Sequence, residues 1–497
     1  MREILLVYDL RDADVAAELE SELTRAFGDK GDSVSVVHSH NSNNAKSLLP
    51  GDFSLVITFL HIRKKPGKEP LAEQDEEGLE LLSWISLNEM NKPMLLIAPT
   101  RTPKLDVLEP NLRNFDVVLT GSTMIQKVVE RSLQAKEFSK LLDVEIRLRS
   151  MTDWGYRLVG HGFGFKREGN FAIEESDVEE LSRASEYVGY VPNWREALQD
   201  VGAKLLNALD KDKEFKLRVA LGLQQAGGEA HARVRFVVKP ELHNLALEAV
   251  LCPDTHDHWM LYAPIFRFLL DQPSVGALLF EGGQRLECLI IEATASGLVA
   301  DLGEKGMTLS RLKEVEKECE WLEKEINGQR SQFNIGNVLR LRREDGKPPL
   351  SQQVKEALES HEWGVVHFAG HSYYDTGSKN GYVFFPGAVP GSIEKVDVTR
   401  FAGWLRRATF TYFSSCDAGA GPFIFSLASQ RVSNILGFRW EIKDLLGSAF
   451  AQEFYKHLFQ TRSLEKAFLK ARQQMYEQYP KDRIWAAPIL IKQLSDS

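Results

Sequence analysis

Long apolar stretches are missing from this sequence of 497 residues. No run approaches the roughly 20 residues that a helix needs to cross a bilayer. The opening segment, MREILLVYDL, is a charged residue followed by a short strand rather than a secretion signal. Long Ser, Gln or Pro tracts are missing as well, although apolar residues make up 43% of the chain. We therefore expect a globular protein of the cytoplasm.

Cysteine and net positive charge are also scarce. The four cysteines, Cys252, Cys288, Cys319 and Cys416, form no CxxC pair, which is typical of free thiols in a reducing compartment, so we expect no disulfides. The chain has 61 Lys and Arg against 70 Asp and Glu, a net charge of −9. This balance argues against a general binder of nucleic acids or membrane surfaces, because those partners reward clustered cations.

The glycine-rich loops of nucleotide-binding proteins are not found. No GxxxxGK[ST] pattern occurs, which excludes the usual P-loop NTPase. The segment GHGFGF, from Gly160 to Phe165, does not follow a strand and open a helix with the spacing of a dinucleotide fold. We predict a turn there.

Apolar runs alternate with amphipathic stretches over the first 134 residues. This alternation predicts a parallel sheet covered by helices, in a flavodoxin-like or TIR-like domain. Open α/β sheets bind ligands at the carboxyl ends of their strands. Asp9, Asp12 and Asp14 follow the first predicted strand there, and His38 and His40 follow the second. They are either a binding site or solvated loop residues and turn formers.

Two specific activities fit this domain poorly. The third predicted strand, VITFLHI, ends without the aspartate of a phospho-acceptor receiver. The stretch SWISLNEMNKPMLLIAP resembles the part of TIR domains in which a Trp precedes a functional Glu, but Trp84 and Glu89 lie one residue too far apart. We therefore interpret the domain as a TIR-like sensing or self-association module rather than an NAD-cleaving enzyme.

Two apolar runs in the last third of the chain end in residues that carry chemistry. HEWGVVHFAGHS brings His371 to the end of one predicted strand, and TFTYFSSCDAGAG brings Cys416 to the end of another, beside a glycine-rich turn. Parallel neighbours that stop at one sheet edge would place the imidazole beside the thiol. An imidazole that accepts the thiol proton makes a nucleophilic thiolate. The alternative is a buried Cys that packs as a small hydrophobe and a His that is a satisfied polar group.

These motifs resemble the CHAT domain of caspase-like (clan CD) peptidases, which are related to separase and the gingipains. VVHFAGHS corresponds to the family's histidine motif and YFSSCDAGAG to its cysteine motif, while WEIKD, WAAPILI and ELHNLALEAVL match three further segments between about Trp194 and Leu490. His371 precedes Cys416 by 45 residues, close to the roughly 50 of caspases. The resemblance implies a caspase-type α/β sheet, peptide-bond hydrolysis without metal or cofactor, and a catalytic dyad of His371 and Cys416.

One position departs from the family. Glycine usually follows the histidine and donates its backbone N–H to the oxyanion, and this chain has Ser372 there. Serine keeps the N–H but adopts positive φ less readily than glycine. We predict that the backbone of Ser372, Gly370 and Cys416 forms the oxyanion hole.

Four side chains are candidates for the substrate pocket. Asp417, beside the nucleophile, and Asp444, at the predicted end of a strand, would form an acidic pocket for an Arg or Lys side chain, or are solvated carboxylates. Trp440 and Tyr373 would line an apolar pocket, or belong to the core.

Two groups of potential metal ligands are interpreted as ordinary structure. His367 and His371 lie four residues apart, but in a predicted strand rather than on a helix. Cys252, His256 and His258 are crowded around a proline turn, which favours a loop. We expect no metal site.

A chain of 497 residues exceeds one ordinary core and predicts two or three domains. We assign 1–137 to a TIR-like or flavodoxin-like sensor domain, 138–190 to a linker or intermediate region, and 191–497 to the caspase-like domain, with an inactive half before a catalytic half at about 335–497.

The expected function is a signal-activated cysteine endopeptidase that cleaves partner proteins encoded nearby. The resemblance adds a role in prokaryotic antiviral defence or programmed cell death. An activating protein or signal at the amino-terminal domain and further copies of the chain are the other expected partners, with no membrane and no direct nucleic acid. The alternative is a catalytically inactive scaffold that assembles through its amino-terminal domain, which Ser372 favours.

Overall fold

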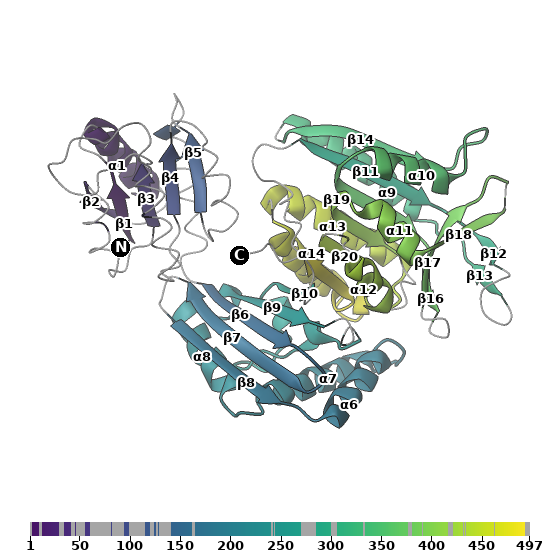
Figure 1. Cartoon of the computed structure of the whole chain (residues 1–497), viewed down its shortest axis with the longest axis horizontal. Helices are drawn as coiled ribbons and strands as arrows, with labels where there is room; N and C mark the ends of the chain where they lie inside the picture. Colours follow the sequence, from purple (N-terminus) through teal and green to yellow (C-terminus); the bar gives the residue numbers. More distant parts are fainter. Residues whose placement is uncertain are drawn as a thin grey trace.

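A computed structural model of the chain is shown in Figure 1. The structure describes residues 2–8, 12–28, 34–40, 45, 55–59, 81, 94–98, 115–119, 124–125, 128, 141–161, 165–239, 242, 244–269, 285–299, 306–331, 333–375, 380–389, 391–415, 421–430, 432, 434–461 and 463–492. Among these residues, none forms a helix of the length and apolarity that crossing a bilayer requires.

The amino-terminal part forms a five-stranded sheet of its own, in which every strand is parallel to its neighbour. In spatial order the strands are β2 (Val34–Ser39), β1 (Arg2–Val7), β3 (Leu55–Phe59), β4 (Met94–Ala98) and β5 (Phe115–Leu119). All of β3 is buried, as expected for a central parallel strand, and helix α1 (Ala13–Gly28) contacts β2. The order 2-1-3-4-5 is that of flavodoxin, so the predicted fold class of this part is confirmed.

Besides two smaller sheets of two and three strands, the rest of the described chain is built around a sheet of eleven strands. In spatial order they are β14 (Ile335–Arg342), β11 (Leu286–Ala293), β15 (Trp363–Gly370), β19 (Ala408–Ser414), β20 (Asn434–Phe438), β21 (Pro488–Lys492), β10 (Ile265–Leu269), β9 (Ala232–Val238), β6 (Leu141–Leu148), β7 (Asp153–His161) and β8 (Phe165–Ala172).

This sheet is mixed rather than wholly parallel. The strands from β14 to β20 run parallel, those from β21 to β6 also run parallel to one another, and the two sets meet in the antiparallel pair β20–β21. The strands β6, β7 and β8 are antiparallel because short connections join them, and Gly160 pairs with Phe165 across the predicted turn. The two parallel sets fit the expected arrangement of two halves.

The region 138–190, which we expected to be a linker or intermediate region, supplies β6, β7 and β8 to the large sheet, together with helix α6 (Glu175–Tyr187). Val144, Ile146 and Leu148 on β6 are fully buried in its core, and Figure 1 shows β6 beside β9. The half that we expected to begin at about residue 335 begins earlier in the sequence. Strand β11, which starts at Leu286, lies between β14 and β15.

Helices cover both faces of the strands around β15. Helices α9 (Val315–Gly328), α13 (Asp444–Thr461) and α14 (Leu464–Gln478) contribute to one hydrophobic core, and α10 (Leu350–Ser360), α11 (Val398–Leu405) and α12 (Gly421–Ser429) to the other. Successive side chains of β15 point to opposite faces of the sheet. Val365 and Ala369 therefore belong to the first core, and Val366 and Phe368 belong to the second. Helices α7 (Trp194–Leu209) and α8 (Phe215–Ala226) belong to the first core as well.

Candidate active site

The site lies at the carboxyl edge where β15 and β19 end side by side. Their register pairs Trp363 with Ala408 and continues to Ala369 with Ser414, always with an offset of 45 residues. His371 and Cys416 differ by the same number in the sequence. Cys416 and Asp417 themselves lie outside the described residues.

A hydrogen bond between two side chains joins the residues next to the two predicted catalytic positions. The Oγ atoms of Ser372 and Ser415 lie 2.7 Å apart, and both residues are buried. Ser372 follows His371, and Ser415 precedes Cys416. The ends of the two motifs are therefore held together just beyond Ala369 and Ser414, the last paired positions of β15 and β19.

A backbone carbonyl orients the imidazole of His371. Its Nε2 lies 2.7 Å from the carbonyl oxygen of Ser310, in the segment that leads into α9. A carbonyl oxygen only accepts, so Nε2 must carry the hydrogen and donate it. In the neutral ring, Nδ1 is then the nitrogen with a lone pair.

Burial also keeps this imidazole neutral. His371 is only 6% exposed, and desolvation lowers its pKa below the ordinary 6.5, while the Ser310 hydrogen bond and the negative charge of Asp444 act in the opposite direction. The net effect is a lowered pKa. A neutral imidazole at neutral pH is the form that accepts a proton.

We expected Asp444 to end a strand, and this prediction is wrong. Asp444 is the first residue of α13, and WEIKD follows β20 instead of forming a strand. Its Oδ2 accepts a hydrogen bond from the backbone N–H of Glu314 at 3.0 Å. Asp444 thus ties the start of α13 to the segment that carries Ser310. The acidic-pocket hypothesis for Asp444 and Asp417 stays a prediction.

Ser372 occupies an ordinary backbone conformation. Among the described residues other than glycine, positive φ occurs at Lys213 and His256. Ser372 begins β16 (Ser372–Asp375), which is antiparallel to β17 (Asn380–Pro386), and the carbonyl of His371 accepts from Phe384 N at 3.2 Å. Pairs alternate in such a ladder, so the N–H of Ser372 points away from β17.

Gly370 is required by close packing. A Cβ atom built on it would lie 2.7 Å from the carbonyl oxygen of Ala293 on β11, its neighbour in the register.

The two aromatic candidates for the substrate pocket, Trp440 and Tyr373, make mainly structural contacts. Trp440 is buried in the first core, and Tyr373 is half-buried against a small cluster that contains Phe384.

His367 and His371 do not converge on one point. His367 is fully buried, with Nε2 at 2.9 Å from Glu318 Oε1 on α9 and Nδ1 at 3.2 Å from the hydroxyl of Tyr455 on α13. His371 instead contacts Ser310. Across the part of the chain that the structure describes, no cluster of three or more His, Cys, Asp or Glu side chains is arranged to hold a metal ion.

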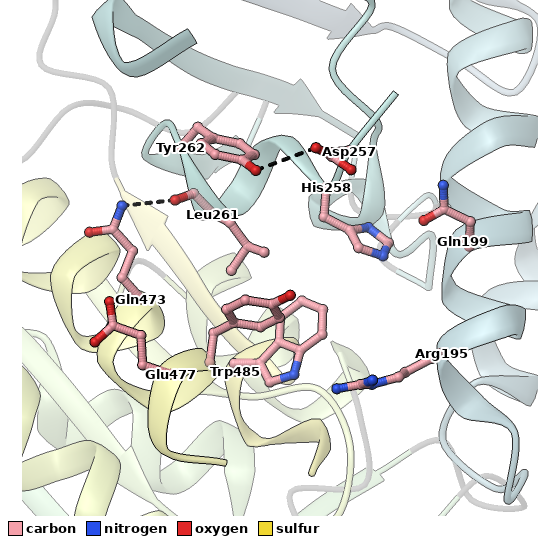
Figure 2. Close-up of a pocket in the computed structure, with 10 residues that line it drawn as sticks. Arg195, Gln199, Asp257, His258, Leu261, Tyr262, Gln473, Glu477 and Trp485 are labelled. Carbon is pink, nitrogen blue, oxygen red and sulfur yellow. Dashed lines mark hydrogen bonds between the residues drawn. The ribbon is translucent and has the colours of Figure 1, made fainter. Parts of the chain in front are cut away.

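The segment around Cys252 and His258 forms a loop, as we interpreted it, with His256 at a φ of 63°. Cys252 is fully buried, while His258 faces a hollow of about 540 Å³ that Figure 2 shows. Arg195 and Gln199 of α7 lie on one side of it, and residues of α14 lie on another.

At the amino-terminal sheet, the ends of β1 and β2 are brought together. His38 contacts the hydroxyl of Tyr8 at 3.1 Å and the carboxylate of Glu20 at 3.0 Å, and the ring of His40 packs edge-on against Tyr8. Asp12 and Asp14 lie at the start of α1. Asp9, Trp84 and Glu89 lie outside the described residues.

Two residues of the site, Ser310 and Ser415, could not be identified from the sequence. Ser310 contributes only a backbone carbonyl, 61 residues before His371, so no side-chain pattern announces it. The Ser415 hydroxyl belongs to the YFSSC motif, but its partnership with Ser372 requires the strand register.

Comparisons with known proteins agree with the motifs. The CHAT domain family matches residues 199–493. No curated protein matches the chain. The signal receiver domain of a Luxo repressor protein from Vibrio parahaemolyticus is 16% identical, with a TM-score of 0.21, over 28% of this chain and 95% of that domain.

The separase of the Saccharomyces cerevisiae separase–securin complex is 10% identical, with a TM-score of 0.34. The likeness covers 85% of this chain, which spans about a third (35%) of the separase chain. Both structural likenesses are too remote to support an argument about function. The family match stands by itself, and because it includes more than half of the 497 residues, this protein belongs to the CHAT domain family, the caspase-like family that its motifs resemble.

Proposed function

We propose that the chain is a cysteine endopeptidase in which Cys416 is the nucleophile and His371 the general base. The observation that supports this most is the pair of contacts around the site: Ser310 holds Nε2 of the imidazole, and Ser372 bonds to the residue before Cys416. The constant register of β15 and β19 adds support, because its offset equals the separation of the two residues.

In the proposed mechanism, Nδ1 of His371 accepts the thiol proton, and the sulfur attacks the carbonyl carbon of the scissile peptide bond. The C–N bond then breaks, and the imidazolium returns the proton to the leaving amine. Water hydrolyses the thioester that remains, with the same imidazole as base, and the thiol is regenerated. The Ser310 carbonyl leaves Nδ1 of the neutral ring free to accept a proton, and it stabilises the imidazolium that forms.

The oxyanion formed in each step needs donors close to the attacked carbonyl. The backbone N–H of Ser372 is directed away from β17, which suits this role, and serine reaches that conformation without positive φ. The difference from the family's glycine therefore does not argue for an inactive scaffold.

The proposal includes control of activity. A peptidase in a cell must be restrained, and the flavodoxin-like sheet at the amino terminus is the unit available to sense a signal or partner protein. Cleavage of one or a few partner proteins in antiviral defence or programmed cell death is the biological role that the motifs suggest.

The test compares wild type with Cys416→Ala and His371→Ala in a lysate that contains the products of neighbouring genes, and identifies new protein amino termini by mass spectrometry. We expect new termini with wild type only, and a loss of rate by about 10²–10⁴-fold for His371→Ala, the usual share of general base catalysis. His361→Ala, an exposed histidine, is the matched control.

Thiol labelling separates an inactive scaffold from a missing trigger. Burial raises the pKa of Cys252 and Cys319 and raises that of Cys288 to about 12, so these three thiols stay protonated and unreactive at neutral pH. A peptide-based thiol probe should label Cys416 and lose that labelling in His371→Ala. Equal, slow labelling of Cys416 in both proteins, with no new termini, would contradict the proposed function.

A further inference from the structure

A hollow of about 630 Å³ lies at the same sheet edge as His371. Its walls come from the ends of β11 and β14 and from the segment that enters α9. We call it the basic hollow, after four cations that line it, Arg311, Lys313, Arg342 and Arg343.

The basic hollow is linked to the imidazole through Ser310 and through the register of the large sheet. Arg311 directly follows Ser310, whose carbonyl holds His371. In the sheet, Glu292 at the hollow pairs with Ala369 on one side and with Arg342 on the other. One strand, β11, therefore separates β14 from the strand that carries His371.

The charge of the hollow is positive once its own ion pairs are taken into account. Glu292 is bound by Arg340 at 2.9 Å, and Glu344 by Lys347 at 2.6 Å. Arg343 has Asp345 at 3.6 Å. Glu316 is the remaining carboxylate of the lining.

The other three cations form no ion pair of this kind, although the charge of Arg342 also acts on Glu344, whose carboxylate is bound by Lys347. Within the described ranges, no carboxylate lies at ion-pairing distance from Arg311, Lys313 or Arg342. The chain as a whole carries −9, so this concentration of positive charge is local. Two guanidinium groups and an ammonium group facing one cavity match a carboxylate, which Arg can bind through two parallel hydrogen bonds.

We propose that the basic hollow binds an acidic side chain, Asp or Glu, of the peptide that is cleaved at His371 and Cys416. This inference rests on the proposed peptidase function and names its substrate class. A volume of about 630 Å³ is in the range of ligand-binding cavities. The alternative preference for a basic side chain has less support, because Asp444 already accepts the Glu314 N–H.

The binding test uses the full chain with Cys416→Ala and fluorescein-labelled hexapeptide pools. In each pool one position is fixed as Asp, Glu, Asn, Gln or Lys and the others are randomised, and binding is measured by fluorescence anisotropy. We expect the acidic pools to bind about tenfold more tightly than their amide counterparts, as a charged hydrogen bond would give. The difference should shrink at 0.5 M salt.

Charge reversal locates the binding. Arg311→Glu and Arg342→Glu should each abolish the preference for acidic pools, and Lys324→Glu, which makes the same change at an exposed position of α9 outside the hollow, should retain it. Equal binding of acidic and amide pools, no binding of any pool, or an equal effect of Lys324→Glu would overturn the inference.

A cleavage arm distinguishes the two proposals. Wild type is incubated with the same pools, and products are sequenced. Cleavage without acidic preference refutes the basic hollow as a subsite and leaves the peptidase intact. Charge-selective binding that is lost in Arg311→Glu, without any cleavage, supports the acidic-peptide site and counts against the peptidase.

Discussion

At the residue scale, the chemistry of His371 depends on groups that reach it from two other elements. Ser310, before α9, decides which ring nitrogen carries the hydrogen, and Asp444, at the start of α13, supplies a negative charge that raises the pKa of the imidazole against the effect of burial. Asp444 also holds the backbone of Glu314. One carboxylate thus affects both the position and the protonation of the proposed base.

Replacing Asp444 with Asn should therefore move the acidic limb of the pH–activity profile. The amide keeps an acceptor for the Glu314 N–H but removes the charge, so the pKa of His371 falls further. The base is active when neutral, and activity should then persist to lower pH than in wild type. The measurement is kcat/KM against pH, which reports the pKa values of the free enzyme.

Asp345→Asn is the control for this change, because Asp345 is almost fully exposed and outside the His371 contacts. Its acidic limb should coincide with that of wild type. An Asp444→Asn limb that stays in place, or moves to higher pH, would show that another group sets the pH dependence.

At the element scale, the alignment of β11, β15 and β19 determines whether the site can form. Gly370 marks a close approach of β15 to the β11 backbone, since a Cβ there would meet both the carbonyl oxygen and the Cβ of Ala293 at 2.7 and 2.8 Å. The first of these atoms is backbone, and the second is attached directly to it, so neither can rotate away.

Gly370→Ala should lower the free energy of unfolding by roughly 1–3 kcal/mol, the usual cost of overpacking. Gly403→Ala on α11 is the matched control, because a Cβ there meets nothing within 4 Å, and a helical glycine replaced by alanine should stabilise by about 0.5–1 kcal/mol. Urea unfolding midpoints test both. An unchanged midpoint for Gly370→Ala would mean that β11 and β15 do not pack this closely.

Sequence patterns could predict the elements that carry His371 and Cys416, because both strands are largely apolar and the residues beside them are small. They could not predict Ser310, which acts through its backbone, or the helical start at Asp444, where WEIKD has the alternation of a strand. Strand β8 was missed for a related reason. Its sequence, FKREGNFA, is largely exposed and lacks the apolar face that identifies a buried strand.

At the scale of the whole molecule, a buried charged cluster joins the two halves of the large sheet. Arg439, just after β20, donates to the carbonyls of Asn244 and Leu245, and Arg267 on β10 is paired with Glu248. Burial, with Arg267 nearby, lowers the pKa of Arg439 to about 9. Removing one member of such a cluster leaves a buried charge without its partner, which destabilises the fold. Because the two halves share the cluster, we expect them to fold as one unit.

The extent of that unit can be tested by truncation. A fragment of residues 138–497 keeps every strand of the eleven-stranded sheet, whereas 191–497 loses β6, β7 and β8. The shorter fragment would expose the edge of β9 and the core surface that Val144, Ile146 and Leu148 cover.

We expect 138–497 to be soluble and to unfold cooperatively, with the near-ultraviolet circular dichroism of fixed aromatic side chains. The fragment 191–497 should be insoluble or lack that signal, because its apolar core is open to water. Cooperative folding of both fragments, with equal solubility and the same near-ultraviolet signal, would mean that 138–190 is only a linker. Loss of folding in both would instead mean that the amino-terminal sheet stabilises the larger one, and that a signal received there can reach His371 through the stability of the whole chain.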